Sequence, residues 1–488
     1  MILLPFQVPL WLYITLLLAG SLSALHALLW KRDPRAAMGW IAVCLLFPGA
    51  GTILYWLFGV NRLRTRGQQL RVLWPALVVD SEHSTDEPDD ATVARAAETM
   101  AQRVPGGLGD LARLGRKVTR RPLLRGNRLQ ALYNGEEAYP AMLEAIGAAR
   151  ETVLLSTYIF DTDATGLAFV DALVAAQARG VEVKVLIDGI GEHYSRPRAS
   201  KVMRRRGLTV ARFLPSSLLR PNLHMNLRNH RKLLVIDGQV GFTGGMNIGD
   251  RHLAARMDNP RRVIDVHFRI EGPVVAQMEA VFHEDWAFVT DTRPDAPRLR
   301  ASLGEGEALC RGVNDGPNED FERLTWILLG ALAVARRRVL IMTPYFIPDR
   351  PLVTAINAAA LRGVRIELML PGKNNLPYVD WACRAMLWEL LQNGVQAWYQ
   401  PPPFVHTKLL VVDDHYVLLG SANLDPRSLR LNFEFNLEVY DHKLVVELAR
   451  HFEAVRETSR PIYQAELDGR PLLVRVRDGL ARLASPYL

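Results

Sequence analysis

Two nine-residue stretches of one pattern decide the fold. They are His230-Arg231-Lys232-Leu233-Leu234-Val235-Ile236-Asp237-Gly238 and His406-Thr407-Lys408-Leu409-Leu410-Val411-Val412-Asp413-Asp414. Each reads His-x-Lys-x4-Asp, and an Asn follows each Asp ten residues later, at Asn247 and Asn423. The copies are 176 residues apart at all four positions (406 − 230, 408 − 232, 413 − 237 and 423 − 247). Four identities at one fixed offset indicate an internal duplication, and the rest of the chain must bring the two copies together.

Composition narrows the class of protein. The chain has 488 residues, 49% hydrophobic residues and a net charge of +8, which suits a globular protein with added membrane segments. That charge is too modest for a polybasic nucleic-acid binder, and no nucleic-acid partner is expected. The cysteines Cys44, Cys310 and Cys383 are far apart and form no CxxC pair. They therefore indicate neither a disulfide framework nor a zinc site.

Residues 1–66 are predicted to be a membrane anchor. An apolar run over residues 6–30, with His26 its one titratable group, is long enough to cross a bilayer. A cleaved signal peptide is disfavoured, because no Lys or Arg precedes the run and its apolar part is too long. Lys31, Arg32 and Arg35 follow directly, which places this end in the cytoplasm and the N-terminus outside.

A second apolar segment covers residues 38–58 and carries Pro48-Gly49 near its middle. It either spans the bilayer or forms a re-entrant hairpin of two short helices. Arg62, Arg64 and Arg66 follow it, so both of its flanks are basic. The positive-inside rule therefore slightly favours the hairpin and a cytoplasmic location for the rest of the chain.

The remaining chain divides into four parts. Residues 67–125 are expected to be a linker with an acidic stretch at 80–90, a helix at 91–104 and a basic run from Arg116 to Arg125. Strand–helix–strand alternation predicts an α/β domain over 126–295 and its duplicate over 296–460, each with a largely parallel sheet. Residues 461–488 mix Leu and Arg and are expected either to lie on a membrane as a basic amphipathic tail or to pack on the domain.

The repeated residues suit phosphoryl chemistry. In extended chain, a His and a Lys two positions apart share a face, and a hairpin turn at each Asp brings the Asn back toward them. Two facing sets would form one site in which Lys232, Lys408, Asn247 and Asn423 hold phosphoryl oxygens. One of His230 and His406 would attack phosphorus while the other serves as acid and base. Since two lysines supply the positive charge, no metal and no cofactor is expected.

Four carboxylates accompany these groups. Asp237 and Asp413 belong to the predicted catalytic motifs, and a role in turns and hydrogen bonds is the better expectation for them. Asp265 and Glu434 follow the motifs on predicted strands. They are expected either to orient the imidazoles by accepting their second N–H or to form structural salt bridges.

These motifs resemble the HKD signature of the phospholipase D superfamily and, within it, the bacterial membrane-bound cardiolipin synthases. The similarity includes Ser156-Thr157-Tyr158-Ile159-Phe160, Thr343-Pro344-Tyr345-Phe346-Ile347-Pro348, Gly244-Gly245-Met246-Asn247 and Gly420-Ser421-Ala422-Asn423. Val263-Ile264 departs from the Trp-Arg pair expected before Asp265, which weakens the transfer of a role to that residue.

The resemblance implies two tandem phospholipase D-like α/β domains with a pseudo-twofold active site behind N-terminal membrane helices. It also implies a bacterial inner-membrane enzyme that converts two phosphatidylglycerol molecules into cardiolipin and glycerol. His230 would be the nucleophile and His406 the acid/base. The partners would be anionic phospholipids and the bilayer.

Two alternatives stay open at this stage. The same site could hydrolyse phosphodiesters, as a phospholipase D or a nuclease, if water reaches the phosphohistidine. A catalytically silent lipid-binding protein is the alternative outside enzymes, and two intact motifs argue against it.

Overall fold

The computed structural model describes residues 9–31, 34–60, 99, 102–104, 107–215, 227–292, 306–317 and 322–485. They form two compact units, an N-terminal one and a much larger one that holds both repeats. The acidic stretch at 80–90 and most of the helix expected at 91–104 lie outside the described residues.

The N-terminal unit is a small helical cluster. Helix α1 (Leu10–Trp30) is, within the described ranges, the helix long and apolar enough to cross a membrane. Helix α2 (Pro34–Leu46) follows, then α3 (Ala50–Leu54) and a π-helical turn at Tyr55–Gly59. The 13 residues of α2 extend only about 20 Å, which is short of a bilayer core.

The second apolar segment turns back on itself. Near the end of α2, the Cys44 carbonyl lies against Gly20, where a side chain would not fit. The chain then reverses at Phe47–Gly49 and returns along α1. This return is shown by Trp56, which donates to Ser23 Oγ at 3.0 Å, and by the Tyr55 hydroxyl, which lies 2.6 Å from His26 Nδ1. Both ends of the segment thus lie near the same end of α1. The segment therefore folds as two short helical pieces joined by a turn, and both the span and the re-entrant hairpin stay predictions.

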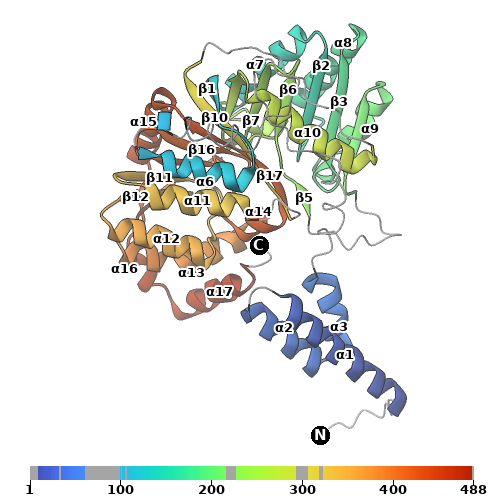
Figure 1. The fold of residues 1–488 in the computed structure, drawn as a ribbon, viewed down its shortest axis with the longest axis vertical. Helices are drawn as coiled ribbons and strands as arrows, with labels where there is room; N and C mark the ends of the chain where they lie inside the picture. The colour runs from blue at the N-terminus through green and yellow to red at the C-terminus, as the bar shows by residue number, and fades with distance from the viewer. Residues whose placement is uncertain are drawn as a thin grey trace. The chain divides into compact units, whose positions relative to one another are not determined.

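The larger unit is built on one continuous sheet that contains both repeats (Figure 1). The first half contributes, in spatial order, β1 (Leu124–Tyr133), β9 (Val266–Glu271), β7 (Val240–Gly244), β6 (Leu233–Ile236), β2 (Thr152–Thr157), β3 (Glu182–Asp188) and β4 (Thr209–Phe213). The second half contributes, in the matching order, β10 (Ala308–Asp315), β17 (Asn432–Tyr440), β16 (Tyr416–Gly420), β15 (Leu409–Val412), β11 (Arg338–Met342), β12 (Arg365–Pro371), β13 (Gln396–Gln400) and β18 (Arg460–Pro461). The halves join where β1 and β10 pair antiparallel.

The expectation of largely parallel sheets is wrong. Within each half, the parallel strands are β2–β3–β4 and β11–β12–β13, and the edge strand β18 pairs antiparallel with β13. The repeated motif lies on β6–β7 and β15–β16, which are tight hairpins closed at Asp237 and Asp413. A connection of only three residues (237–239 and 413–415) can join only antiparallel strands, so the motif itself makes each sheet mixed.

Helices cover the sheet on both faces. The first half carries α7 (Asn134–Ala148), α8 (Ala164–Ala178), α9 (Ala199–Arg205) and α10 (Val275–Thr290). The second carries α11 (Arg323–Val334), α12 (Arg350–Leu361), α13 (Pro377–Gln392), α14 (Pro426–Arg430), α15 (His442–Glu457), α16 (Gln464–Asp468) and α17 (Leu472–Leu483). An aspartate caps the N-terminus of three of these helices, because its carboxylate accepts a hydrogen bond from a first-turn N–H group. These N-cap residues are Asp163 for α8, Asp349 for α12 and Asp441 for α15.

Part of the expected linker belongs to the folded unit. Helix α6 (Gly109–Thr119) lies beside α11 in Figure 1, and its Leu111 is buried in the second half's hydrophobic core. Gly115 of α6 allows Arg311 of β10 to approach, since a side chain there would collide with its guanidinium. Arg311 pairs with Glu438 at 2.7 Å, and both side chains are buried. The basic run from Arg116 onward is therefore split between this helix, the connection at 120–123 and the start of β1.

Candidate active site

Short crossing strands fix each motif to the opposite half. Strand β5 (Arg228–Asn229), just before His230, runs parallel to β17 of the second half. Strand β14 (Phe404–Val405), just before His406, runs parallel to β8 (Val263–Ile264) of the first half. The backbone N–H of His230 donates to the Phe433 carbonyl at 2.9 Å, and that of His406 to the Ile264 carbonyl at 2.7 Å. The two halves therefore build one site.

The imidazoles are paired crosswise with carboxylates. His230 Nδ1 lies 3.0 Å from both oxygens of Glu434, and His406 Nδ1 lies 2.9 Å from Asp265 Oδ2. Each carboxylate follows the other motif in the chain. Because Nδ1 is engaged, Nε2 is the ring nitrogen left for chemistry in the cavity that both imidazoles line.

The motif lysines sit directly beneath their histidines. Lys232 Nζ donates to the His230 carbonyl and Lys408 Nζ to the His406 carbonyl, each at 2.6 Å. Residues 230–232 and 406–408 connect two strands instead of lying within one, but the hydrogen bond still brings each Lys back to its His. Burial lowers the pKa of Lys232 to about 7 and that of Lys408 to about 8. A bound anion would therefore stabilise the protonated form of both lysines and raise their pKa values.

Both asparagines line the same cavity. Asn247 Oδ1 accepts from the Ile159 N–H at 3.1 Å, so the side-chain Nδ2 of Asn247 is directed away from Ile159. Asn423 Oδ1 is buried and has no hydrogen-bond partner among the described residues. The predicted set of His, Lys and Asn is thus brought together.

The motif aspartates lie at the far end of their strands. The Asp237 carboxylate accepts from the N–H groups of Arg150, Glu151 and Thr152 at 2.8–2.9 Å. Asp413 accepts in the same way from residues 336–338. Neither lines the cavity. Their positions agree with the hydrogen-bonding expectation and not with membership of the catalytic set.

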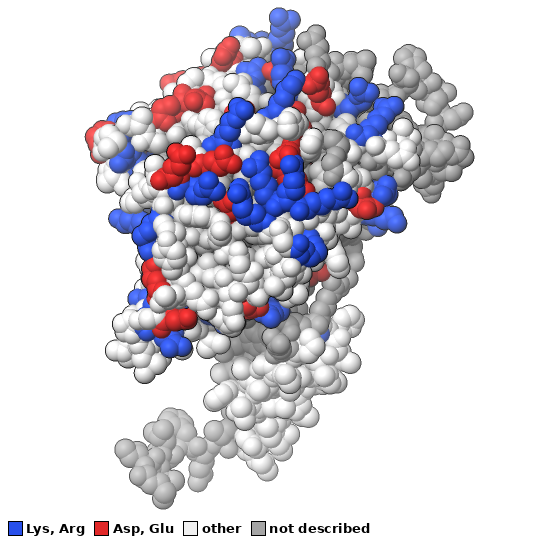
Figure 2. All heavy atoms as spheres, turned by 90° about the vertical axis from the view of Figure 1, so that its left-hand side faces the viewer, with Lys and Arg blue, Asp and Glu red and all other residues white. Residues whose placement is uncertain are grey.

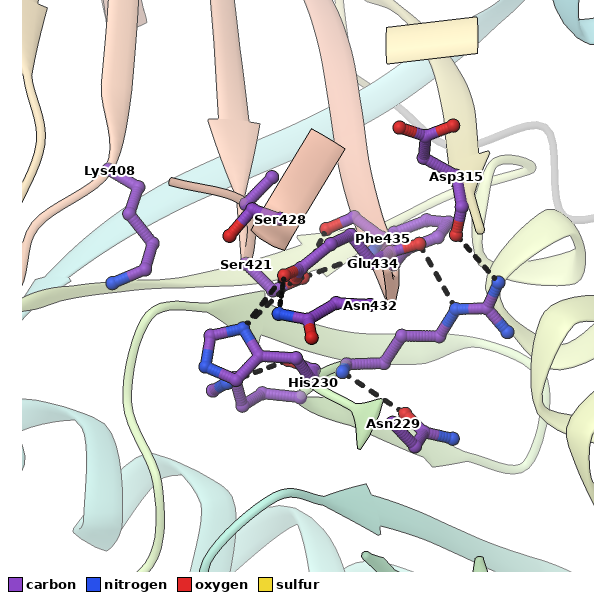
Figure 3. A network of polar contacts seen from close by, with 12 residues as sticks. Asn229, His230, Asp315, Lys408, Ser421, Ser428, Asn432, Glu434 and Phe435 are labelled. Carbon is purple, nitrogen blue, oxygen red and sulfur yellow. Dashed lines mark hydrogen bonds and ion pairs between the residues drawn. The ribbon is translucent and has the colours of Figure 1, made fainter. Parts of the chain in front are cut away.

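Two residues for which no role is predicted from the sequence, Ser421 and Asn432, break the symmetry of the site. The Ser421 hydroxyl donates to Glu434 Oε2, and Asn432 Nδ2 donates to Oε1 at 3.0 Å, so that both converge with His230 on one carboxylate (Figure 3). Their counterparts beside Asp265 are Gly245 (421 − 176) and Val263 (432 − 169, where 169 = 434 − 265), which have no side-chain donor. The contrast between Gly-Gly-Met-Asn and Gly-Ser-Ala-Asn was the available signal.

This asymmetry separates the two carboxylates chemically. Burial by itself raises the pKa of Glu434, but His230, Lys232 and the Ser421 hydrogen bond outweigh it, so the pKa lies below its ordinary value. Burial raises the pKa of Asp265 to about 7, against the opposing effects of Lys408 and the Val266 N–H. Burial also lowers the pKa of His230 to about 4 and that of His406 well below its ordinary value. At neutral pH the His230–Glu434 pair is therefore a neutral imidazole beside an ionised carboxylate. The His406–Asp265 pair can instead hold one shared proton.

The cavity has a volume of about 940 Å³ and two unlike walls. Near His230 lie Tyr158, whose ring centroid is 5.1 Å from the imidazole, and Arg228. Near His406, the position equivalent to Arg228 is Phe404 (228 + 176), with ring centroids 5.9 Å from His406 and 6.2 Å from Tyr345. Further cations line the cavity at Arg251, Arg261, Arg262, Lys373 and Arg427. The two walls differ in that Phe404 takes the place of Arg228, while tyrosines and cations occur on both.

This pairing of two half-sites across a duplicated sheet agrees with the comparisons with known proteins. The family model described as "Cardiolipin synthase, PLD-like domain" matches residues 142–286 and 328–456. The chain belongs to this family. It is accordingly an enzyme of the phospholipase D-like phosphatidyltransferase type. A second model, "Phospholipase D-nuclease N-terminal", matches residues 11–59 and covers the helices of the N-terminal unit.

Relatives match over nearly the whole length. "Cardiolipin synthase A" of Pseudomonas entomophila is 33% identical over 96% of both chains. "Major cardiolipin synthase ClsA" of Bacillus subtilis is 32% identical over 94% of this chain and 95% of its own. The crystal structure of phosphatidylserine synthase from Haemophilus influenzae Rd KW20 aligns with 78% of this chain and 100% of its own, with a TM-score of 0.60 and 17% identity. That likeness shows the shared fold.

Proposed function

We propose that this protein is a cardiolipin synthase that transfers a phosphatidyl group between two phosphatidylglycerol molecules and releases glycerol. The observation that carries the proposal is a pair of His–Lys–Asn sets. Both imidazoles and both asparagines line one cavity, each Lys donates to the carbonyl of its own His, and each imidazole contacts a carboxylate from the other half. The names of the full-length relatives point to the same reaction.

In the first step, His230 Nε2 attacks the phosphorus of one phosphatidylglycerol. The bond from phosphorus to the headgroup glycerol oxygen breaks, and His406 protonates that oxygen, so glycerol leaves and a phosphatidyl-histidine remains. Lys232, Lys408 and the two asparagines bind the non-bridging oxygens and stabilise the charge of the transition state.

In the second step, a headgroup hydroxyl of another phosphatidylglycerol enters. His406, now deprotonated, accepts the hydroxyl proton, the oxygen attacks phosphorus, and the bond to His230 breaks to give cardiolipin. The proton on His406 restores the starting state. Each bond cleaved is replaced by an equivalent one, so the transfer consumes no nucleotide.

The unequal carboxylates support this division of labour. The phosphorylated imidazole carries positive charge, which the ionised Glu434 beside His230 stabilises. The acid must hold a proton near neutral pH, and Asp265, with its pKa near 7, lets the His406 pair do so. The donors Ser421 and Asn432 therefore set which histidine attacks.

We place the enzyme in the bacterial inner membrane, with α1 as its anchor and its catalytic unit on the cytoplasmic side. The basic residues that flank both apolar segments support this orientation. Figure 2 shows a face on which Lys and Arg side chains gather in a band beside a broad area with few charges. Such a band suits anionic headgroups.

The deciding experiment is incubation of the purified full-length protein with phosphatidylglycerol vesicles and no nucleotide. Cardiolipin and glycerol formed in equal amounts are the expected products. Phosphatidic acid as the main product would instead identify a hydrolase, and no product would leave only a lipid-binding role. A His230→Ala/His406→Ala double variant, prepared identically, is the control for contaminating activity.

A further inference from the structure

Helix α17 (Leu472–Leu483), near the end of the chain, turns its apolar face away from the protein. Its large apolar side chains are widely exposed: Leu472 by 74%, Leu473 by 83%, Val476 by 50%, Leu480 by 63% and Leu483 by 77%. The spacing of 472, 476, 480 and 483 places them along one stripe of the helix, with Leu473 at its margin. Soluble proteins rarely leave such a stripe in water.

The opposite face anchors the helix in this orientation. Asp478 is buried and accepts hydrogen bonds from Arg470 at 2.5 Å and from Arg477 at 2.7 Å. The Arg477 guanidinium lies 4.5 Å from the ring centroid of Trp381 on α13. Rolling the leucines inward would break these ion pairs, because Asp478 would have to leave its buried site. The exposed stripe is therefore held in place by the fold.

The charges around the stripe fit an anionic surface. Arg475 and Arg482 are exposed on α17, and Arg477 lies at the other margin of the stripe. Asp478 is the one acidic residue of this helix, and it is buried on the inner face. An apolar stripe flanked by arginines is the pattern of a helix that lies in the interface of a negatively charged bilayer.

The stripe is continuous with the side of the active-site cavity that Tyr345 and Phe404 line. Tyr378 of α13 lines both that cavity and the apolar groove between α13 and α17. Ala481 of α17 packs on the small cluster of Val379 and Ala382, against which Tyr345 also packs. Tyr345 leads through Phe404 to His406. An apolar route therefore runs from α17 to the reacting groups.

We propose that α17 docks in the bilayer interface and that phospholipids reach the cavity past Tyr378, with their acyl chains along the α13–α17 groove. The occupant of this face is the lipid bilayer rather than a protein, because the α1 segment keeps a bilayer next to the chain and the flanking charges are all basic. This inference rests on the proposed phosphatidyl transfer and names the side from which its substrate enters.

The kinetic test uses the full-length protein in vesicles of phosphatidylglycerol diluted with phosphatidylcholine. The test variant combines Leu472→Ser and Leu483→Ser, which are exposed and do not line the α13–α17 groove. The control is Leu361→Ser, which alters a leucine that is 72% exposed on α12. The double variant should need a surface fraction of phosphatidylglycerol about 10-fold higher for half-maximal rate, since its apolar contact with the bilayer is reduced. Its rate on monomeric short-chain phosphatidylglycerol should stay within about 2-fold of wild type, because that substrate needs no docked surface. Equal losses on both substrates, or no loss on vesicles, would overturn the proposal.

A second readout needs no turnover. Leu480→Cys carries an environment-sensitive fluorophore, and Leu361→Cys is the matched control. Cys44, Cys310 and Cys383 are all buried, so labelling is selective. Lipids with nitroxide groups at shallow acyl positions should quench the Leu480 probe and leave the Leu361 probe bright. Quenching without cardiolipin synthesis would retain the docking surface and reject the proposed reaction. A Leu480 probe that responds to protein concentration and not to nitroxide lipid would identify a protein contact and reject bilayer docking.

Discussion

His230 Nδ1 lies 3.0 Å from both carboxylate oxygens of Glu434, although 204 residues separate them and they belong to different halves of the duplication. The reciprocal contact joins His406 to Asp265 over 141 residues. Each half thus supplies the carboxylate that contacts the other half's motif histidine, so neither half forms this contact by itself.

Exchanging the leaving group should separate the two histidines. His230→Ala and His406→Ala should each lose about two to four decades of activity on phosphatidylglycerol, because the nucleophile or the acid is missing. A phosphatidyl ester of p-nitrophenol needs no acid to depart. On it the His406 variant should release a burst of nitrophenol and accumulate phosphatidyl-enzyme, measured by absorbance and mass spectrometry. A burst from the His230 variant instead would reverse the assigned roles.

Removing a donor from Glu434 should move the acid limb of the pH profile. Ser421→Ala takes away a hydrogen bond to the ionised carboxylate, so the pKa of Glu434 rises and activity is lost at a higher pH than in wild type. The measurement is kcat/KM between pH 4 and 9, which reports the free enzyme. Ser421→Cys, a weaker donor of similar size, should give an intermediate shift. An unchanged acid limb in Ser421→Ala would show that this serine only packs.

The alkaline limb should begin near neutral pH. Asp265, with a pKa of about 7, shares the proton of the His406 pair, and that proton is lost as the pH rises. Lys232 and Lys408, with pKa values of about 7 and 8, also discharge there, and phosphate binding weakens with them. The decline of kcat should disappear in Asp265→Asn, whose remaining activity is low, while the rise of KM from the lysines persists. A wild-type rate that stays flat to pH 9 would contradict this acid assignment.

The motif aspartates should prove structural. Asp237→Asn weakens hydrogen bonds to three backbone N–H groups and should destabilise the protein by roughly 1–3 kcal/mol, measured by chemical unfolding of the detergent-purified chain. The folded fraction should keep kcat within about 10-fold of wild type, in contrast to the histidine variants. A loss of several decades with unchanged stability would restore Asp237 to the catalytic set.

The buried pair of Arg311 and Glu438 should matter for stability alone. Arg311→Met leaves the buried Glu438 carboxylate, to which Tyr416 and Tyr440 are also hydrogen-bonded, without its cation. The free energy of unfolding should fall by about 3–5 kcal/mol. Pairing it with Glu438→Leu should recover part of that loss, since no charge is then left buried. The check is the unfolding midpoint of both variants against wild type, and additive losses would contradict the idea of a coupled pair.

The sequence by itself determined the duplication, the repeated His, Lys and Asn residues and the apolar N-terminal segments. These follow from local patterns: a fixed offset, two-residue spacing at each His and Lys, and long apolar runs. It misjudged the sheet as largely parallel, because strand–helix alternation describes only β2–β3–β4 and β11–β12–β13, whereas the motif hairpins are antiparallel.

Only the tertiary structure shows which residues of the two halves contact one another. The symmetric motifs do not reveal which carboxylate serves which histidine, since that pairing depends on β5 and β14 crossing to the opposite half. The sequence does not show that Ser421 and Asn432 are hydrogen-bond donors to Glu434, which only the folded structure reveals. Likewise, the leucines of α17 match either a packed or a membrane-facing helix until the buried Asp478 fixes which face turns outward. Contacts between residues far apart in the chain set the local dielectric and hydrogen bonding, and these govern the chemistry.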